Sequence, residues 1–437
     1  MISGSTTTSA FFGAALATAA IVLPSLQFAY AEAPPERGIV SFKYLNYQDS
    51  QSFGESQSGA THSGGTESGE STSKNNTHIH DVISGASTVS TTTGGTSTGG
   101  SSTGGTAVSG NQNRIGVNAY SIMALVPVAG EWTIGTTLTS DSVSGASPTY
   151  HSSGLAKMTD LRRAIDLQLT RYFSSGTLSI GTSYSKETDY LSRGYSVQGS
   201  LSTEDKNTTL TLGGSLNNDD INPVIPPYAE YHKKVYAGIF GITRVLSKND
   251  IIQLNLGYAN GNGDFTDHYK LYDNRPDERN NSTLVTRWNH HFEATDGTAR
   301  LSYRYYSDTF GIRAHMLGAE YVQPLRNGWT VAPLLRLYSQ TEADFYVAAG
   351  AAERANSTAP TPPPVNALYY SEDQRLSAFG AVTLGLKVSK QLNADWLADV
   401  KIEGYEQRSQ WALSGKGDPG LATFTARSIQ VGLSRLF

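Results

Sequence analysis

The sequence predicts an all-β fold, a closed antiparallel β-barrel that crosses a membrane. From residue 113 onward, apolar and polar side chains alternate with a period of two, which is typical of strands with one apolar and one polar face. The alternating segments are roughly ten to fourteen residues long, near the length with which a tilted strand crosses a bilayer. Short and long connections alternate between them, as turns and loops do in outer-membrane barrels.

The amino-acid composition excludes several other classes of protein. Charged residues make up 16% of the chain, against about a quarter in soluble domains, which argues against a coiled coil or a helical bundle. The chain has no Cys, which excludes disulfides, a thiol nucleophile, Cys-ligated zinc, covalent haem and a lipoprotein anchor on this chain. The formal net charge of -5 gives no reason to expect nucleic acid as a partner.

Residues 1–31 are predicted to be a signal peptide. An apolar run over 10–31 ends in the small-x-small sequence Ala29-Tyr30-Ala31, and polar chain follows at once. We therefore expect Sec-type export with cleavage near Ala31, although the first nine residues lack Lys and Arg. An uncleaved anchor is the alternative, and Pro24 and Gln27 inside the run argue against it. The barrel would then occupy 32–437.

The first outer loop, 49–112, is predicted to be disordered because Ser, Thr and Gly dominate it. Within it lie His78, His80 and Asp81, whose imidazoles fall on one side of an extended chain and could hold Cu(II), Ni(II) or Zn(II). The alternative, which we adopt, is a solvated polar loop that binds no metal. No cofactor is expected on this chain.

The segments that follow alternate as strands do. Leu178, Ile180, Thr182 and Tyr184, for example, alternate with Ser179, Gly181 and Ser183. Counting the segments predicts about sixteen strands, with both termini on the periplasmic side, short periplasmic turns and long outer loops. Fourteen or eighteen strands are alternatives, since the parity of 233–246 and 311–324 is ambiguous. The segments are 38–48, 113–126, 131–143, 160–173, 176–188, 192–203, 207–217, 233–246, 250–260, 283–294, 297–308, 311–324, 328–341, 374–389, 395–408 and 423–437.

Lipid offers the backbone no hydrogen-bond partner, so the sheet must close on itself, with its apolar face toward lipid and its polar face toward the lumen. Interface girdles are expected from Trp132, Trp288, Trp329, Trp396 and Tyr172. The luminal charges either select solutes or form a lattice of pairs that fills the bore. They are Arg162, Asp166, Arg300, Arg304, Arg336, Lys387, Asp399, Lys401 and Glu403.

The end of the chain resembles the assembly signal of outer-membrane barrels. Gly432 and the terminal Phe437 fit that pattern, whereas Arg435 stands where it prefers an aromatic residue. The expected partners are therefore outer-membrane lipid and the barrel-assembly machinery, and the expected location is the bacterial outer membrane.

Several stretches resemble a Gram-negative family that is defined only as a domain of unknown function and regarded as porin-like outer-membrane β-barrels. They are 141–148, 185–190, 303–315, 338–346 and 373–379. The resemblance runs from about residue 37 to the end, and the long Ser/Thr/Gly-rich loop departs from it. Genes of this family lie near those of a flavin transferase and a small lipoprotein, which implies a link to electron transfer outside the cytoplasm.

The motif residues fall mainly where strands meet the longer loops. We expect them either to form one ring around the mouth or to cap strand ends and anchor loops. They are Asp141, Glu187, Asp189, Tyr190, Asp308, His315, Glu342 and Asp344.

Three functions follow from these features. The first is a porin-like channel for small polar solutes. The second is a scaffold or sheath for a periplasmic or surface electron-transfer partner that carries flavin or haem. The third, a barrel enzyme, is not expected, because the nearest approach to a catalytic set is Ser307, Asp308 and His315, and their spacing supports no such role.

Overall fold

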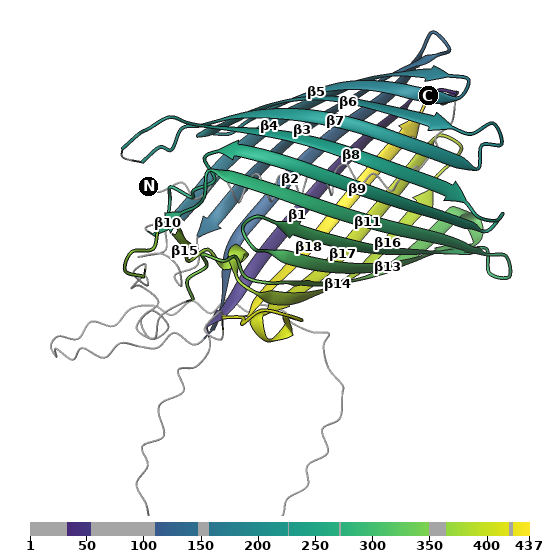
Figure 1. Ribbon diagram of the computed structural model, residues 1–437. Coiled ribbons are helices and arrows are strands. Elements are labelled where there is room, and N and C mark those ends of the chain that lie inside the picture. Colours follow the sequence, from purple (N-terminus) through teal and green to yellow (C-terminus); the bar gives the residue numbers. More distant parts are fainter. Residues whose placement is uncertain are drawn as a thin grey trace, which may run out of the picture. The chain divides into compact units, whose positions relative to one another are not determined.

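The computed structural model describes residues 33–53, 110–146, 157–225, 227–270, 272–348, 364–418 and 423–437. It is a closed antiparallel barrel of sixteen strands, in which every strand pairs with its two neighbours (Figure 1). The prediction of a transmembrane barrel of about sixteen strands is thus confirmed. A second unit of the chain, Gly54–Ser109, lies outside the described residues together with 1–32. The expected signal peptide, most of the loop that was expected to be disordered, and His78, His80 and Asp81 therefore lie outside them too.

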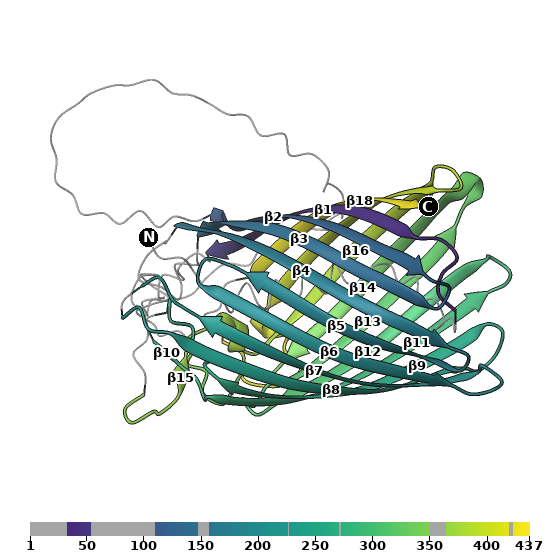
Figure 2. The same cartoon turned by 90° about the horizontal axis from the view of Figure 1, so that it is seen from above.

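The barrel strands follow the order of the sequence, as Figure 2 shows from above, and a two-stranded sheet of β10 and β15 lies outside the ladder. The strands are β1 (Ile39–Phe53), β2 (Gly110–Val128), β3 (Trp132–Ala146), β4 (Lys157–Phe173), β5 (Gly176–Lys186), β6 (Tyr190–Ser202), β7 (Thr208–Ile221), β8 (Tyr231–Val245), β9 (Asp250–Gly263), β10 (Asp273–Asn274), β11 (Glu278–Phe292), β12 (Gly297–Asp308), β13 (Arg313–Pro324), β14 (Trp329–Gln340), β15 (Tyr370–Ser371), β16 (Phe379–Gln391), β17 (Trp396–Arg408) and β18 (Phe424–Leu436).

The barrel closes where the first strand meets the last. β1 pairs with β18 over Ile39 to Gln51. Just beyond the ladder, Gly38 and Phe437 exchange backbone hydrogen bonds of 2.9 Å in both directions. No edge strand is left in the ladder, which is the condition for a sheet surrounded by hydrocarbon.

The two faces of the wall differ as the period of two requires. On β7, Leu212 is 69% exposed, whereas its neighbour Thr211 is only 8% exposed. Large apolar side chains at alternate positions therefore form the outer, lipid-facing surface, and polar side chains turn into the barrel, where neighbouring strands shield them. Within the described residues, no helix is long and apolar enough to span a membrane.

The two ends of the barrel differ in their connections. One end, the turn end, carries short turns such as 174–175 and 392–395; the other, the loop end, carries the longer connections such as 264–277 and 341–378. Two connections at the loop end, 187–189 and 309–312, are also short, so the alternation of short and long connections is incomplete. The first loop is shorter than expected, because β1 continues through Phe53 and β2 begins at Gly110.

The expected aromatic girdle is corrected at one residue. Trp132, Trp329 and Trp396 each begin a strand at the turn end. Tyr172, in contrast, shares the luminal face of Arg162 and Asp166, and its hydroxyl lies 3.5 Å from that of the buried Thr133. Tyr172 differs from both charged residues by an even number of positions along the strand, so all three side chains must point to the same side of the wall.

Candidate functional site in the lumen and at its mouth

One side of the lumen, formed by β5 to β9, is lined by mostly small and uncharged side chains, apart from the Lys233–Asp219 pair toward the loop end. Pairing places these residues side by side: Gly181 lies opposite Ser196, Gly213 opposite Gln198, and Gly241 opposite Asn255. These small side chains project only a short way into the barrel, and we call this side the small-residue wall. Its luminal positions include Ser179, Gly181, Ser183, Ser196, Gln198, Gly213, Ser215, Ala237, Gly241, Asn255 and Gly257.

The other side of the lumen carries charge on β12, β13, β14, β16, β17 and β1. We call this set the charged arc. It contains six cations, Lys43, Arg300, Arg304, Arg336, Lys387 and Lys401, and three carboxylates, Glu320, Asp399 and Glu403. The arc includes seven of the nine luminal charges expected from the sequence, whereas Lys43 and Glu320 were not among those expected.

Three ion pairs lie within the charged arc. Arg300 Nη1 lies 3.2 Å from Glu320 Oε2. Glu403 Oε1 lies 3.0 Å from Lys401 Nζ and 3.8 Å from Arg336 Nη2. Within the described residues, the side chains of Lys43, Arg304 and Lys387 make no hydrogen bond or ion pair within 4 Å, and Lys43 and Lys387 both lie in the field of Asp399. The arc therefore has more positive than negative charge facing the lumen.

The two remaining expected charges, Arg162 and Asp166, lie on β4, away from the arc. Arg162 Nε donates to Asp141 Oδ1 at 2.8 Å, and Asp141 is only 3% exposed. Asp141 was expected at the rim, but it belongs to this luminal pair because it lies directly opposite Arg162 in the β3–β4 ladder.

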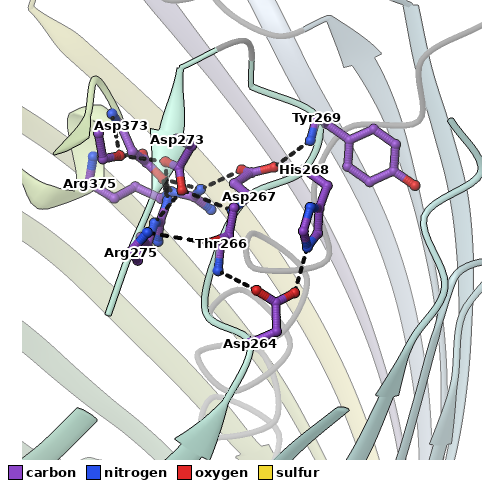
Figure 3. A network of polar contacts seen from close by, with 10 residues as sticks. Asp264, Thr266, Asp267, His268, Tyr269, Asp273, Arg275, Asp373 and Arg375 are labelled. Atoms are coloured by element: carbon purple, nitrogen blue, oxygen red, sulfur yellow. Dashed lines mark hydrogen bonds and ion pairs between the residues drawn. The ribbon is translucent and has the colours of Figure 1, made fainter. Parts of the chain in front are cut away.

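At the loop end, a buried network joins the β9–β11 loop to the segment that precedes β16 (Figure 3). Arg275 Nε lies 2.7 Å from Asp273 Oδ1, and Arg275 Nη2 lies 2.9 Å from Asp373 Oδ2. Arg375 binds Asp373 and lies 3.0 Å from Asp267. The segment around Arg375 lies on the luminal side of β14, because the luminal Gln340 donates to the carbonyl oxygens of Arg375 and Ser377.

Charge balance explains why this network tolerates burial. The side chains of Arg275 and Asp373 are 5% and 1% exposed. Burial alone would raise the pKa of Asp373, but the charges of Arg375, Lys270 and Arg275 outweigh it and hold the pKa well below its usual value. An apolar cluster of Phe310, Ile312, Ala343 and Leu376 packs beside the network. We call the β9–β11 loop and 372–378 together the lid.

The lid also reaches the opposite side of the mouth. Tyr269, on the β9–β11 loop, donates a hydrogen bond from its hydroxyl to Asp189, between β5 and β6. Burial raises the pKa of Asp189, although the hydrogen bond from Tyr269 opposes the shift. Carboxylate oxygens of Asp160, Glu187 and Asp189 all lie within 4.8 Å of one another. Such oxygens are the ligands that hard divalent cations prefer.

The other residues expected at the rim make separate contacts rather than one ring. Tyr190 accepts a hydrogen bond from Lys233 at 3.2 Å, and Asp308 lies 2.6 Å from Arg279. Glu342 accepts from the backbone N–H of Lys416 at 3.1 Å. The backbone N–H of Asp344 donates to Phe310 at 2.8 Å.

His315 differs from the expectation most clearly, because it faces outward. Its Nδ1 lies 2.8 Å from the hydroxyl of Tyr303, and its ring lies 5.1 Å from that of Tyr305. Both tyrosines are direct sequence neighbours of the luminal Arg304 and therefore point outward. Asp308 lies four positions from Arg304, so it points into the lumen, where it binds Arg279. Asp308 and His315 therefore lie on opposite faces of the wall and cannot act as one catalytic set.

The lid residues Arg275 and Asp273 were not predicted from the sequence. The feature of the sequence that could have indicated them is a cluster of acidic residues with an arginine in one short loop. The cluster consists of Asp264, Asp267, Asp273 and Arg275. Asp373 and Arg375 were recognised only as part of a family motif.

A family model described as "Protein of unknown function (DUF3570)" matches residues 13–428. The chain belongs to this family. No curated protein matches the chain of this DUF3570 member. Among solved structures, it is similar to the siderophore receptor PirA from Pseudomonas aeruginosa, with 8% identity and a TM-score of 0.41, covering 86% of this chain and 57% of the receptor. The DUF3570 chain thus spans little more than half of that receptor's length.

The DUF3570 barrel is also similar to two further outer-membrane proteins. A FadL homologue from Pseudomonas aeruginosa has 8% identity and a TM-score of 0.40, with 92% of this chain and 90% of that chain covered. A BenF-like porin from Pseudomonas fluorescens Pf-5 has 8% identity and a TM-score of 0.38, with coverages of 92% and 99%.

Proposed function

We propose that this protein is a passive channel for small polar solutes in the bacterial outer membrane. The observation that carries the proposal is the lumen itself, in which the small-residue wall faces the charged arc. A barrel of sixteen strands is wide enough for an aqueous pathway unless side chains or loops fill it. Small side chains on five consecutive strands would leave room for such a pathway, and the charged arc would keep it hydrated.

The lid supports a restriction to small solutes. Its Tyr269 contacts Asp189 between β5 and β6, and its segment around Arg375 lies against the luminal side of β14. The lid therefore contacts the barrel at two separate places around the mouth. The buried ion pairs of Arg275 hold this chain in place. Solutes that enter from the loop end would have to pass the lid before they reach the charged arc.

The outer surface supports the proposed location. Exposed leucines and isoleucines alternate with luminal polar residues around the ladder, and the barrel has no unpaired edge. We further propose that the chain is exported through the Sec pathway and inserted by the barrel-assembly machinery, which would read the end of β18 with Gly432 and Phe437. Phe437 hydrogen bonds Gly38 at the point of closure, so the same residue would serve recognition and closure.

Recording from planar lipid bilayers tests the channel. The full-length protein, refolded or extracted in detergent, should give stable conductance steps in potassium chloride at neutral pH. The same preparation unfolded by heating should give none, and this control identifies current that comes from detergent. A folded protein that inserts, as judged by protease protection in vesicles, but never conducts would contradict the proposal.

A further inference from the structure

Basic side chains gather on the lipid-facing surface at the loop end of β4 to β8. Each is in phase with exposed apolar neighbours on its strand; Arg163, for example, alternates with Leu161 and Ile165, which are 45% and 37% exposed. We call this set the outer basic patch. It consists of Arg163, Lys186, Arg193, His232 and Lys234, and Asp220 is the carboxylate among them.

The patch has an excess of positive charge that the protein does not neutralise. Arg193 and His232 share Asp220, with distances of 2.9 and 3.0 Å to its two carboxylate oxygens. Arg163 and Lys186 lie directly opposite each other in the β4–β5 ladder, a position in which like charges repel. In the part of the chain that the structure describes, Arg163, Lys186 and Lys234 make no hydrogen bond or ion pair.

Tyrosines mark the depth of the patch. Tyr184, Tyr195 and Tyr236 point outward and are 42%, 54% and 53% exposed. Each tyrosine has a cation two residues away on the same face of its strand and nearer to the loop end. These cations are Lys186, Arg193 and Lys234. Outward tyrosines lie at the level of lipid headgroups in membrane barrels. The cations therefore stand where the charged groups of the headgroups lie.

Cations at the turn end differ from those of the patch. Arg171 lies 4.9 Å from the centre of the Phe173 ring, Lys390 lies 5.1 Å from that of Trp329, and Arg435 lies 5.5 Å from that of Trp396. Aromatic rings thus cover these three outward cations, and Trp411 covers the loop-end Arg408 in the same way. Among the described residues, no ring covers a cation of the patch, so these charges remain available to a ligand.

We propose that the outer basic patch binds the phosphate groups of an anionic lipid in the membrane leaflet at the loop end. A headgroup with two phosphates, such as that of a phosphorylated disaccharide lipid, could contact Arg163 and Lys186 with one phosphate and Lys234 with the other, while its acyl chains pack on the tyrosines below. Arginine and lysine form strong charge-assisted hydrogen bonds with phosphate. The inference needs the proposed membrane location but not conduction, so a silent barrel that binds lipid would separate the two proposals.

Native mass spectrometry of the full-length protein in non-ionic detergent tests the patch. The probes are bis-phosphorylated lipid A, the same lipid without its phosphates, and inorganic phosphate as a competitor. We expect wild type to bind the phosphorylated lipid. The triple variant Arg163→Gln, Lys186→Gln, Lys234→Gln should lose roughly ten-fold or more in affinity, because each cation supplies a charge-assisted hydrogen bond.

Arg244→Gln is the matched control, because Arg244 lies on the same face of β8 as Lys234 but at the turn end; it should bind as wild type does. Lys186→Gln alone keeps the test available if the triple variant does not fold, as judged by heat-modifiable mobility on a gel. Equal binding of the lipid without phosphates, or an equal loss in Arg244→Gln, would overturn the proposal. Displacement by millimolar inorganic phosphate would overturn the lipid assignment in favour of free phosphate.

Discussion

Arg275 and Asp373 form a buried ion pair although 98 residues separate them in the chain. Arg275 follows β10, Asp373 follows β15, and these two short strands pair with each other, so the ion pair and the small sheet hold the same two loops together. Both partners are almost completely buried. A buried pair of this kind costs little while it is complete, but the removal of one partner leaves a charge without compensation.

The first prediction therefore concerns Arg275→Met. The variant leaves Asp273 and Asp373 buried with less positive charge, and we expect it to lower the free energy of unfolding of the lid by about 3–5 kcal/mol. Limited proteolysis of the folded barrel measures this, since the lid should be cleaved while the strands resist. Arg37→Met is the control, because the Arg37–Asp395 pair is 45% exposed on both sides and should contribute at most about 1 kcal/mol. Equal protection of wild type and Arg275→Met would contradict the prediction.

The second prediction is the pH dependence of the lid. The charges of Arg375, Lys270 and Arg275 overcome the effect of burial and hold the pKa of Asp373 below its usual value. The stabilisation from Asp373 is therefore complete above its unfolded pKa of about 3.9 and disappears as the pH falls through the lower folded pKa. Proteolysis by an acid-active protease between pH 2 and 5 should reveal lid release only at the acid end. Asp373→Asn should be less protected throughout and should lack this acid step.

The barrel was largely predictable from the sequence because the period of two is a local property. The alternation of residues such as Leu212 and Thr211 shows which face of the sheet each side chain occupies, even when the partner strand is unknown. The ends of the strands were less predictable, because a strand continues for as long as its partner pairs with it. β1 and β2 extend farther than expected, since their pairing continues to Phe53 and Gly110. The local alternation of side chains does not show where this pairing stops.

The mouth was less predictable, for two physical reasons. His315 was assigned to the rim, but a shift of one residue reverses the face of a side chain, and the tight turn over 309–312 resets the phase between β12 and β13. Contacts such as Arg275 with Asp373 join distant loops that have no period, so only their charge density gave a signal. Tyr172 was a different case, since its even spacing from Arg162 already placed it in the lumen.

The third prediction concerns ion selectivity. Six cations against three carboxylates in the charged arc should make the channel pass chloride more readily than potassium. Arg304→Glu combined with Lys387→Glu reverses two charges that form no ion pair with any residue that the structure describes. At about 1 kcal/mol per pair of unit charges in water, we expect the permeability ratio to move toward potassium by about five-fold or more. The reversal potential in a potassium chloride gradient measures this ratio.

Arg244→Glu makes the same kind of charge change on the outward face of β8 and should leave the reversal potential as in wild type. Conductance steps with an unchanged ratio in the double variant would show that the arc does not control permeation, while leaving the channel itself in place. Measurements in molar salt should give a smaller ratio than those in 0.1 M salt, since screening shortens the reach of the luminal charges.

The last prediction compares two glycines in the barrel strands. A Cβ added to Gly176 would lie 2.0 Å from the carbonyl oxygen of Ser200, whereas one added to Gly404 would meet nothing within 4 Å. The oxygen belongs to the backbone of β6, which cannot move without disturbing its hydrogen bonds to β5, so Gly176→Ala should lower the free energy of unfolding by about 1–3 kcal/mol. Gly404→Ala should leave it unchanged or raise it by about 0.5–1 kcal/mol, because Ala loses less backbone entropy than Gly in a strand. Denaturant titration of both variants in the same micelles compares them directly, and an equal loss in the two would mean that close approach to Ser200 is not the cause.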